Sequence, residues 1–183
     1  MNHESIYTRV EFERRFLVPP DSDWRGQVEP YSKNLEDKYI RNSNLRLRVM
    51  TDNDTGRRII KLTKKVASET PFATRISRIL LSETELALFN SMEGDHLKKT
   101  RFYHCHLGRV FSIDVYEGNL DGLLLCETES ESLEDLMSAQ PPPYVKEEVT
   151  VDPFFTGGHL CRCTQSDLLS RLTSLPTTIP EWK

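Results

Sequence analysis

Polar and apolar residues alternate along most of this chain. In the stretch EFERRFLV (11–18), one parity carries Glu11, Glu13 and Arg15, while the other carries mainly apolar side chains. Successive side chains of a strand point to opposite faces, so this stretch predicts a strand with one charged face. Strands are predicted at about 7–18, 37–42, 44–51, 57–66, 73–81, 98–105, 109–117, 122–130 and 145–152.

Helices are predicted between and after these strands. Ser82 and Glu85 form a capping-box signature that opens a helix ending near residue 93. Shorter helices are predicted at about 21–28 and 131–138, and a C-terminal helix at about 158–173. The pattern indicates an α+β fold: a single antiparallel domain built as a barrel or strongly curved sheet, with helices packed outside.

The charged faces of different strands are sorted by sign. Paired bases stand at Arg46 and Arg48, at Lys61 and Lys65, and at Lys99 and Arg101. Paired acids stand at Glu11 and Glu13, at Glu127 and Glu129, and at Glu148 and Asp152. A solvated face explains any one of these strands. It does not explain the sorting, because a merely soluble surface tends to mix both signs.

Barrel strands with their polar faces turned inward explain the sorting better. Clustered Arg and Lys would bind a highly charged anion, and Arg gives bidentate contacts to phosphate oxygens. Clustered carboxylates would hold hard divalent cations such as Mg²⁺ or Mn²⁺, which prefer oxygen ligands. The pattern therefore predicts a metal and polyphosphate site inside the barrel.

Composition narrows the possible partners. The chain has 183 residues, 28% of them charged, and a net charge of −4, which argues against a nucleic-acid or anionic-membrane binder. No run of about 18 apolar residues is present, and the N-terminal stretch lacks an apolar signal core. The four cysteines form no CxxC pair. The cluster of His159, Cys161 and Cys163 is interpreted as a loop or helical turn rather than a metal site, and the cytoplasm is the expected location.

Seven motifs then follow in order: EFERRFLV, LRLR, KLTKK, KTRF, IDVYEG, CETE and EEVTVDPFF. Together they resemble the CYTH domain, or triphosphate tunnel metalloenzyme family, in its short bacterial form. The resemblance covers about residues 9–160 and treats 1–183 as one domain. It implies an antiparallel eight-stranded β-barrel whose charged lumen binds a triphosphate and one or two divalent metals.

The resemblance also assigns roles to residues. The implied metal ligands are Glu11, Glu13, Asp114, Glu127, Glu129 and Glu148, and the implied catalytic residues are Glu11, Glu13, Arg15 and Glu148. The implied phosphate ligands are Arg46, Arg48, Lys61, Lys65, Lys99 and Arg101, with Arg75 as a further candidate. Arg78 has the opposite parity to Arg75 and is expected outside. Arg15 stands where the family motif has lysine.

These observations favour an Mg²⁺- or Mn²⁺-dependent triphosphatase that acts on a linear triphosphate, first of all inorganic tripolyphosphate. Two enzyme alternatives stay open: a class IV-type adenylate cyclase, and a thiamine or nucleoside triphosphatase. A third alternative is a polyphosphate- or nucleotide-binding module without catalysis, which Arg15 keeps open. The expected partner is the small phosphate substrate, with no nucleic acid and no membrane, and a homodimer stays open.

Overall fold

The structure is a computed structural model that describes residues 8–68, 70 and 72–175. Its strands are β1 (Thr8–Leu17), β2 (Ser32–Ile40), β3 (Leu45–Asp52), β4 (Arg58–Ala67), β5 (Ala73–Leu81), β6 (Gly94–His106), β7 (Arg109–Tyr116), β8 (Leu124–Ser130) and β9 (Glu147–Glu148). Its α-helices are α1 (Glu83–Asn90), α2 (Leu133–Met137), α3 (Gly157–Leu160) and α4 (Gln165–Ser174). Short 3₁₀ turns lie at η1 (Arg25–Gln27), η2 (Gly118–Leu120) and η3 (Pro153–Phe155).

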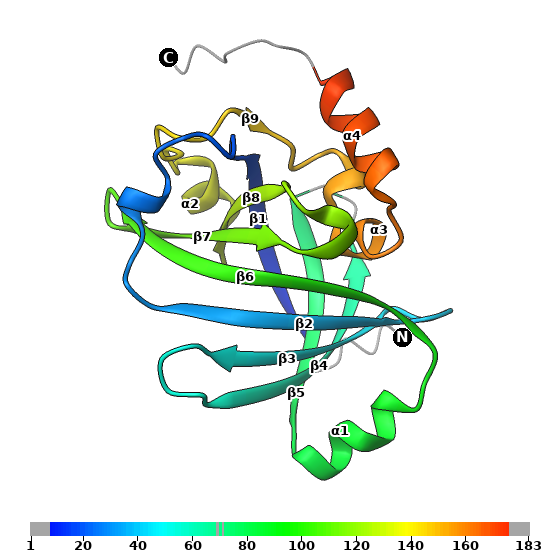
Figure 1. Ribbon diagram of the computed structural model, residues 1–183. Helices are drawn as coiled ribbons and strands as arrows, with labels where there is room; N and C mark the ends of the chain where they lie inside the picture. Colours follow the sequence, from blue (N-terminus) through cyan, green and yellow to red (C-terminus); the bar gives the residue numbers. More distant parts are fainter. Residues whose placement is uncertain (1–7, 69, 71, 176–183) are drawn as a thin grey trace.

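Strands β1 to β8 close into an antiparallel barrel (Figure 1). The hydrogen-bonded order is β5-β4-β3-β2-β6-β7-β8-β1, and β1 pairs back onto β5. The first half of β1 pairs with β5 and its second half pairs with β8. The short β9 adds to the end of β1 beside Phe16 and Leu17. The predicted eight-stranded barrel with helices outside is confirmed.

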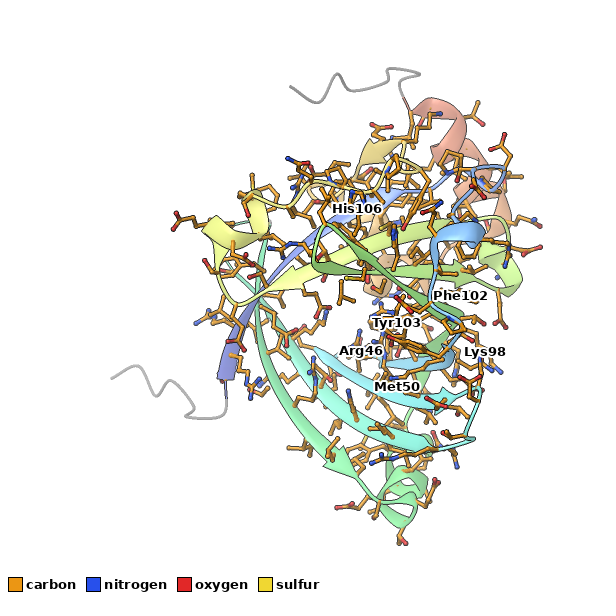
Figure 2. All side chains as sticks on the ribbon, turned by 90° about the vertical axis from the view of Figure 1, so that its left-hand side faces the viewer. Arg46, Met50, Lys98, Phe102, Tyr103 and His106 are labelled. Atoms are coloured by element: carbon orange, nitrogen blue, oxygen red, sulfur yellow. The ribbon has the colours of Figure 1, made fainter. Side chains whose placement is uncertain are left out.

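Strand register turns the charged faces inward. Residues directly opposite each other on paired strands share a face, and Glu127 lies opposite both Arg15 of β1 and Ser112 of β7. Arg101 likewise lies opposite Asp114 of β7 and Lys33 of β2. The charged parity of each strand is therefore continuous around the inside of the barrel. Figure 2 shows side chains pointing into this interior, with Arg46 among them.

The apolar parity packs outward under covering segments. Helix α1 packs through Leu86 and Phe89 against a buried cluster that includes Leu47, Ile60 and Leu62 from the outer face of β3 and β4. A second outer cluster joins barrel residues to chain on either side of it: Phe16, Val18, Trp24, Phe111, Ile113, Leu124, Cys126 and Tyr144. Burial of these side chains stabilises the barrel from outside and leaves its interior free for polar groups.

The C-terminal segment covers one end of the barrel. Lumen-facing Leu97 and Leu125 pack in one buried cluster with Phe155, Leu160 and Leu168 from η3, α3 and α4. Arg171 of α4 is ion-paired with Asp152, which precedes η3. The barrel therefore has a closed end lined by apolar side chains and an open remainder lined by charged ones.

Three sequence expectations need correction. Strand β2 begins at Ser32 rather than near residue 37, because it pairs with β3 on one side and β6 on the other although SKNLE has little apolar alternation. The segment 145–152 contributes only two strand residues, since the chain turns back at Asp152 N–H to Val149 O (3.1 Å). The C-terminal helix is split, because Thr164 caps a new helix with a capping box.

Two local expectations are resolved directly. The capping box of Ser82 and Glu85 is confirmed at the start of α1, which ends at Asn90. The helix expected at about 21–28 is reduced to the 3₁₀ turn η1. Among the described residues, no helix is both long and apolar enough to cross a membrane.

Candidate functional site: a charged cavity inside the barrel

A narrow cavity of about 70 Å³ lies inside the barrel. Charged side chains from six strands make up most of its wall. The lining residues are Glu11, Glu13, Arg15, Tyr39, Arg46, Arg48, Lys65, Arg78, Leu97, Lys99, Arg101, Tyr116, Glu127, Glu129 and Gly157. Among these, seven are basic and four are acidic. The lining therefore carries more positive than negative side chains, although the whole chain is acidic.

Two buried aspartates hold the bases of the cavity in place. Asp37 accepts bonds from Arg48 Nε (2.5 Å) and Nη2 (2.6 Å). Burial would raise the pKa of Asp37, but the Arg48 and Arg46 guanidinium groups hold it far below its usual range. A bidentate pair of this kind fixes the plane of the guanidinium.

Asp114 plays the same part on β7. It accepts bonds from Arg101 Nε (2.6 Å) and Nη2 (2.6 Å), and it is also ion-paired with Lys99. Burial lowers the pKa of Lys99, although Asp114 opposes that effect. Arg101 further bonds Glu127 through Nη2 (2.9 Å). Asp114 is fully buried behind these bases and does not line the cavity.

Two of the basic side chains remain available to an anion. Arg46 is 8% exposed, and its Nε donor has no hydrogen-bond partner among the described residues. Its nearest carboxylate oxygen, Asp37 Oδ1, is 4.0 Å from Nε. Burial lowers the pKa of Lys65, with Glu13 acting in the opposite direction. An unpaired buried donor is costly, so an anion in the cavity would stabilise this wall.

The acidic side of the cavity brings like charges together. Glu13 of β1 lies directly opposite Glu129 of β8. Burial, and then the Glu13 carboxylate, raise the pKa of Glu129 above its usual value. Glu11 lies on the same face and is only loosely paired with Arg78, at 3.4 Å. Carboxylates that repel each other in this way are suited to a cation.

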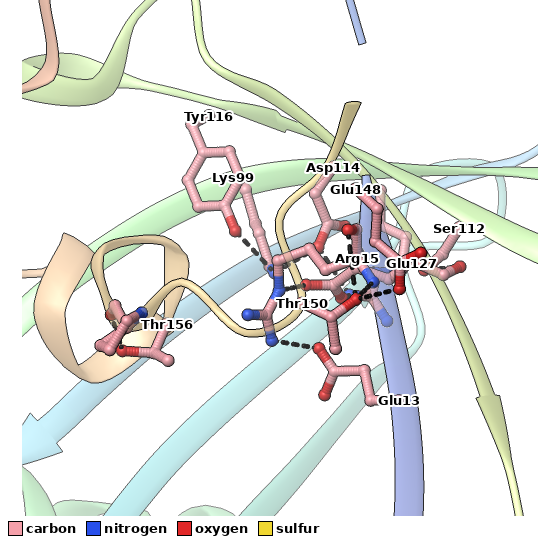
Figure 3. Close-up of polar contacts among 12 residues, drawn as sticks. Glu13, Arg15, Lys99, Ser112, Asp114, Tyr116, Glu127, Glu148, Thr150 and Thr156 are labelled. Atoms are coloured by element: carbon pink, nitrogen blue, oxygen red, sulfur yellow. Dashed lines mark hydrogen bonds and ion pairs between the residues drawn. The ribbon is translucent and has the colours of Figure 1, made fainter. Parts of the chain in front are cut away.

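Arg15 stands between the two charged regions (Figure 3). Its Nη2 donates to Glu13, and its Nε donates to Glu127 Oε1 at 3.0 Å. Burial opposes ionisation of Arg15, but Glu13 and Glu127 raise its pKa above the ordinary arginine value. Arg15 is therefore a permanent charge that neutralises part of the acidic cluster.

The carboxylate oxygens of Glu11, Glu13 and Glu129 fit the donor chemistry of Mg²⁺ or Mn²⁺. Their mutual repulsion is the observation that favours a cation here. Among the described residues, however, no group of three or more His, Cys, Asp or Glu side chains is arranged to hold a metal ion. In this structure Glu13 is instead paired with Arg15.

Several predicted site residues lie elsewhere. Glu148 lies opposite Phe16 and is held by Arg14, which donates from Nε (3.0 Å) and Nη2 (2.7 Å). Glu148 does not line the cavity, so its expected place in the lumen is wrong. The physical reason is that only two residues of that segment pair with β1, and Glu148 faces the buried Arg14.

The two arginines of β5 are exchanged relative to the expectation. Arg78 lies opposite Thr63 and lines the cavity, whereas Arg75 lies opposite Val66 and does not line it. The parity of TRISRIL is ambiguous by itself, because both parities mix polar and apolar residues. Lys61 has the lumen parity, opposite Arg48, but does not line the cavity.

Some lining residues carried no clear signal in the sequence. Tyr39 lies on β2, where little apolar alternation indicates which side chains face the lumen. Gly157 reaches the cavity from α3, which a strand pattern cannot predict. Cys161 and Cys163 make thiol contacts to backbone carbonyl oxygens of Gly158 (3.4 Å) and His159 (3.5 Å), consistent with a helical turn.

Comparison with known proteins places this site in context. No protein-family model matches the chain. The inorganic triphosphatase of Nitrosomonas europaea is 31% identical over 146 residues, which cover 78% of this chain and 91% of that protein. The crystal structure of the inorganic triphosphatase NE1496 has a TM-score of 0.53 at 26% identity, over 82% of this chain and 93% of that one.

A second solved structure shares the fold alone. The PH1819 protein from Pyrococcus horikoshii OT3 has a TM-score of 0.52 at 19% identity, over 69% of this chain and 82% of that one. The identity to the Nitrosomonas triphosphatase over most of its length, together with the closed barrel and its charged interior, shows that the chain belongs to the CYTH, or triphosphate tunnel, family.

Proposed function

We propose that this protein is a metal-dependent hydrolase of linear triphosphates, with inorganic tripolyphosphate as its preferred substrate. The observation that carries the proposal is the barrel cavity, which is lined by seven basic side chains and four carboxylates. The activity named for the Nitrosomonas relative, inorganic triphosphatase, supports the same substrate class.

The basic wall would bind the phosphate chain. Arg46 Nε has no hydrogen-bond partner among the described residues, and Lys65 lines the same cavity, so these two side chains would be the first contacts of the anion. Arg48 and Arg101 are fixed by Asp37 and Asp114 and would meet phosphate oxygens without reorganisation. Donors fixed in advance stabilise charge that develops on a transferred phosphoryl group.

Glu11, Glu13 and Glu129 would hold Mg²⁺ or Mn²⁺. A divalent ion there supplies charge neutralisation for phosphate oxygens and lowers the pKa of a bound water. The lining residues include no Ser, Cys or His, so water rather than such a nucleophile would accept the phosphoryl group. Tyr39, Leu97 and Tyr116 line the cavity beside the charges and limit bulk water.

A second candidate function is a triphosphate-binding module without turnover. One observation favours it: Arg15 is paired with Glu13 and so occupies one of the carboxylates that the metal would need. Without a cation, however, Glu11 and Glu129 would repel an anion in the cavity that they line. We therefore rank hydrolysis first.

The deciding experiment measures phosphate release from tripolyphosphate, ATP, thiamine triphosphate and pyrophosphate, with Mg²⁺, with Mn²⁺ and with EDTA. We expect metal-dependent release that is strongest on tripolyphosphate, and none from the Glu11→Ala/Glu13→Ala variant. The matched control is Glu36→Ala, since Glu36 is an exposed acid on the outside of β2. Chelator-insensitive turnover would refute the metal mechanism, and cyclic AMP from ATP would redirect it toward the cyclase alternative.

Replacing Arg15 by Lys tests the unusual residue of the first strand. Lysine carries the charge but cannot pair with two carboxylates through a planar fork. We expect Arg15→Lys to free Glu13, to keep or raise turnover, and to require less Mg²⁺ for half-maximal rate in a metal titration. A folded Lys variant without turnover would contradict this, and an unfolded one would show that Arg15 is structural.

A further inference from the structure

The closed end of the cavity contains a close contact that depends on a glycine. A Cβ atom added to Gly157 would lie 2.0 Å from Tyr39 Oη and 3.0 Å from Tyr39 Cζ. Real Cβ atoms do not approach other atoms so closely, so any side chain at this position must displace Tyr39. The neighbouring Gly158 differs, because its Cβ would lie 3.9 Å from the Tyr39 ring, in ordinary contact.

This glycine is not explained by backbone conformation. Gly157 opens α3 and is absent from the glycines with positive φ. Glycine is also a poorer helix former than alanine. The space that Tyr39 occupies therefore gives the physical reason for glycine here.

Tyr39 in turn borders the least-satisfied base of the cavity. It lies directly opposite Arg46 on the neighbouring strand, and both residues line the cavity with Gly157. Burial and then Asp37 raise the pKa of Tyr39 to about 12, and the Arg46 guanidinium acts in the opposite direction. The Arg46 Nε donor has no hydrogen-bond partner among the described residues.

We propose that Gly157 is a positioning residue for phosphate binding: it lets the Tyr39 hydroxyl lie at the closed end of the cavity, where that hydroxyl sets the direction of the Arg46 guanidinium. The C-terminal segment thereby forms part of the binding site as well as closing the barrel. This inference rests on the proposed function, since it takes the cavity to be the triphosphate site.

The test compares Gly157→Ala with Gly158→Ala, two identical changes in adjacent residues of one helix. Arg46 would contact phosphate in both the ground state and the transition state, so its displacement raises KM and leaves kcat nearly unchanged. Loss of one hydrogen bond to a charged group predicts a KM for tripolyphosphate about tenfold higher in Gly157→Ala. Gly158→Ala keeps the wild-type KM.

Tyr39→Phe supplies the coupling measurement, because it removes the atom that the new Cβ would meet first. If Gly157 acts through the Tyr39 hydroxyl, the double variant Gly157→Ala/Tyr39→Phe has the KM of Tyr39→Phe alone. Additive effects of the two changes would overturn the proposal, as would a wild-type KM in Gly157→Ala or an equal loss in Gly158→Ala. If Gly157→Ala fails to fold, we expect the double variant Gly157→Ala/Tyr39→Phe to fold. A double variant that also fails to fold overturns the proposal.

Calorimetric titration of tripolyphosphate in EDTA separates this inference from the proposed function. Wild-type protein that binds and hydrolyses tripolyphosphate, with Gly157→Ala binding about tenfold more weakly, supports both. Wild-type protein that neither binds nor hydrolyses it overturns the proposed function and this inference with it. Normal wild-type behaviour with unchanged binding in Gly157→Ala overturns the positioning role alone.

Discussion

At the scale of single residues, carboxylates on the acidic side of the cavity repel each other. Glu13 and Glu129 are placed opposite each other by the pairing of β1 with β8. Like charges in this arrangement destabilise a sheet. The fold tolerates them because burial of the outer clusters stabilises the same strands from the other side.

The first prediction concerns Glu129, whose pKa is raised by burial and by Glu13. Because the pKa of Glu129 is higher in the folded than in the unfolded state, its protonation stabilises the fold, fully so below the ordinary pKa of 4.5. This stabilisation is lost as the pH rises through the raised folded-state pKa. We expect Glu129→Gln in EDTA to have a higher Tm than wild type at neutral pH and an equal Tm at acid pH. Thermal unfolding across pH measures this.

Turnover provides the second readout for the same variant. Glu129→Gln should lose metal-dependent phosphate release although it is more stable without metal. Glu131→Gln is the matched control, because Glu131 is an exposed acid just beyond β8. A lower Tm for Glu129→Gln at every pH would show that its carboxylate is satisfied rather than repelled.

Single residues also mark where sequence reasoning succeeds and where it stops. Alternation placed Glu11, Glu13, Arg46 and Arg48 on lumen faces, because their neighbours along the chain are mainly apolar. It failed for Arg75 and Arg78, since TRISRIL has no apolar parity and only pairing with β4 decides its register. The aspartate that fixes Arg48 was missed because β2 carries little alternation.

At the scale of elements, one ion pair attaches β9 to the first strand. Arg14 is 6% exposed, bonds Glu148 through two nitrogens, and donates from Nη1 to Ala139 O at 2.8 Å. These bonds tie β9 and the preceding loop to the outer side of β1. Their role is structural in geometry, although the family resemblance implied a catalytic one for Glu148.

The second prediction separates these two roles. Glu148→Gln should lower the free energy of unfolding by about 2 kcal/mol, and therefore Tm by about 4–8 °C, because it weakens bonds to a buried guanidinium. Turnover per folded molecule should remain. Glu127→Gln is the contrasting variant, since Glu127 pairs with Arg15 and Arg101 in the cavity. Loss of turnover in Glu148→Gln with an unchanged Tm would restore the catalytic assignment.

Element boundaries were predictable where local chemistry sets them. The capping box of Ser82 and Glu85 begins α1 as expected. A second one, Thr164 with Asp167, was overlooked and splits the C-terminal helix. By contrast, the shortness of β9 depends on how much of β1 is left to pair, which no local pattern contains.

At the scale of the whole molecule, the internal cavity is rich in basic side chains although the chain as a whole is acidic. A chain of net charge −4 keeps seven bases around one internal cavity. Repulsion among those bases favours any anion that enters, while the acidic exterior gives no general affinity for polyanions. Binding and stability of the folded state are therefore linked.

The third prediction follows from that linkage. In EDTA, tripolyphosphate at 100 times its Kd should stabilise the protein by about 2.7 kcal/mol, which corresponds to a rise in Tm of about 5–11 °C. Arg46→Ala should reduce the shift, whereas Arg75→Ala, which removes an exposed base of the outer face, should keep it. Equal shifts in the two variants would place the anion outside the cavity.

The architecture as a whole was accessible from the sequence because the polar faces are sorted by sign and the motifs follow a known order. The closed end was not. It depends on Leu97 and Leu125 meeting Leu160 and Leu168 from a distant segment. Leu97 and Leu125 are apolar residues on otherwise polar strand faces, and the sequence does not indicate which segment packs on them.

The divided pairing of β1 has a consequence for synthesis of the chain. During translation this strand emerges before its partners: β5 supplies pairing from residue 73 onward, β8 from 124 and β9 from 147. Until then its backbone amides are open to other nascent chains, which is a hazard for aggregation. The charges of Glu11, Glu13, Arg14 and Arg15 discourage such pairing, so side chains that later line the cavity or form the Glu148 ion pair first protect the unfinished polypeptide.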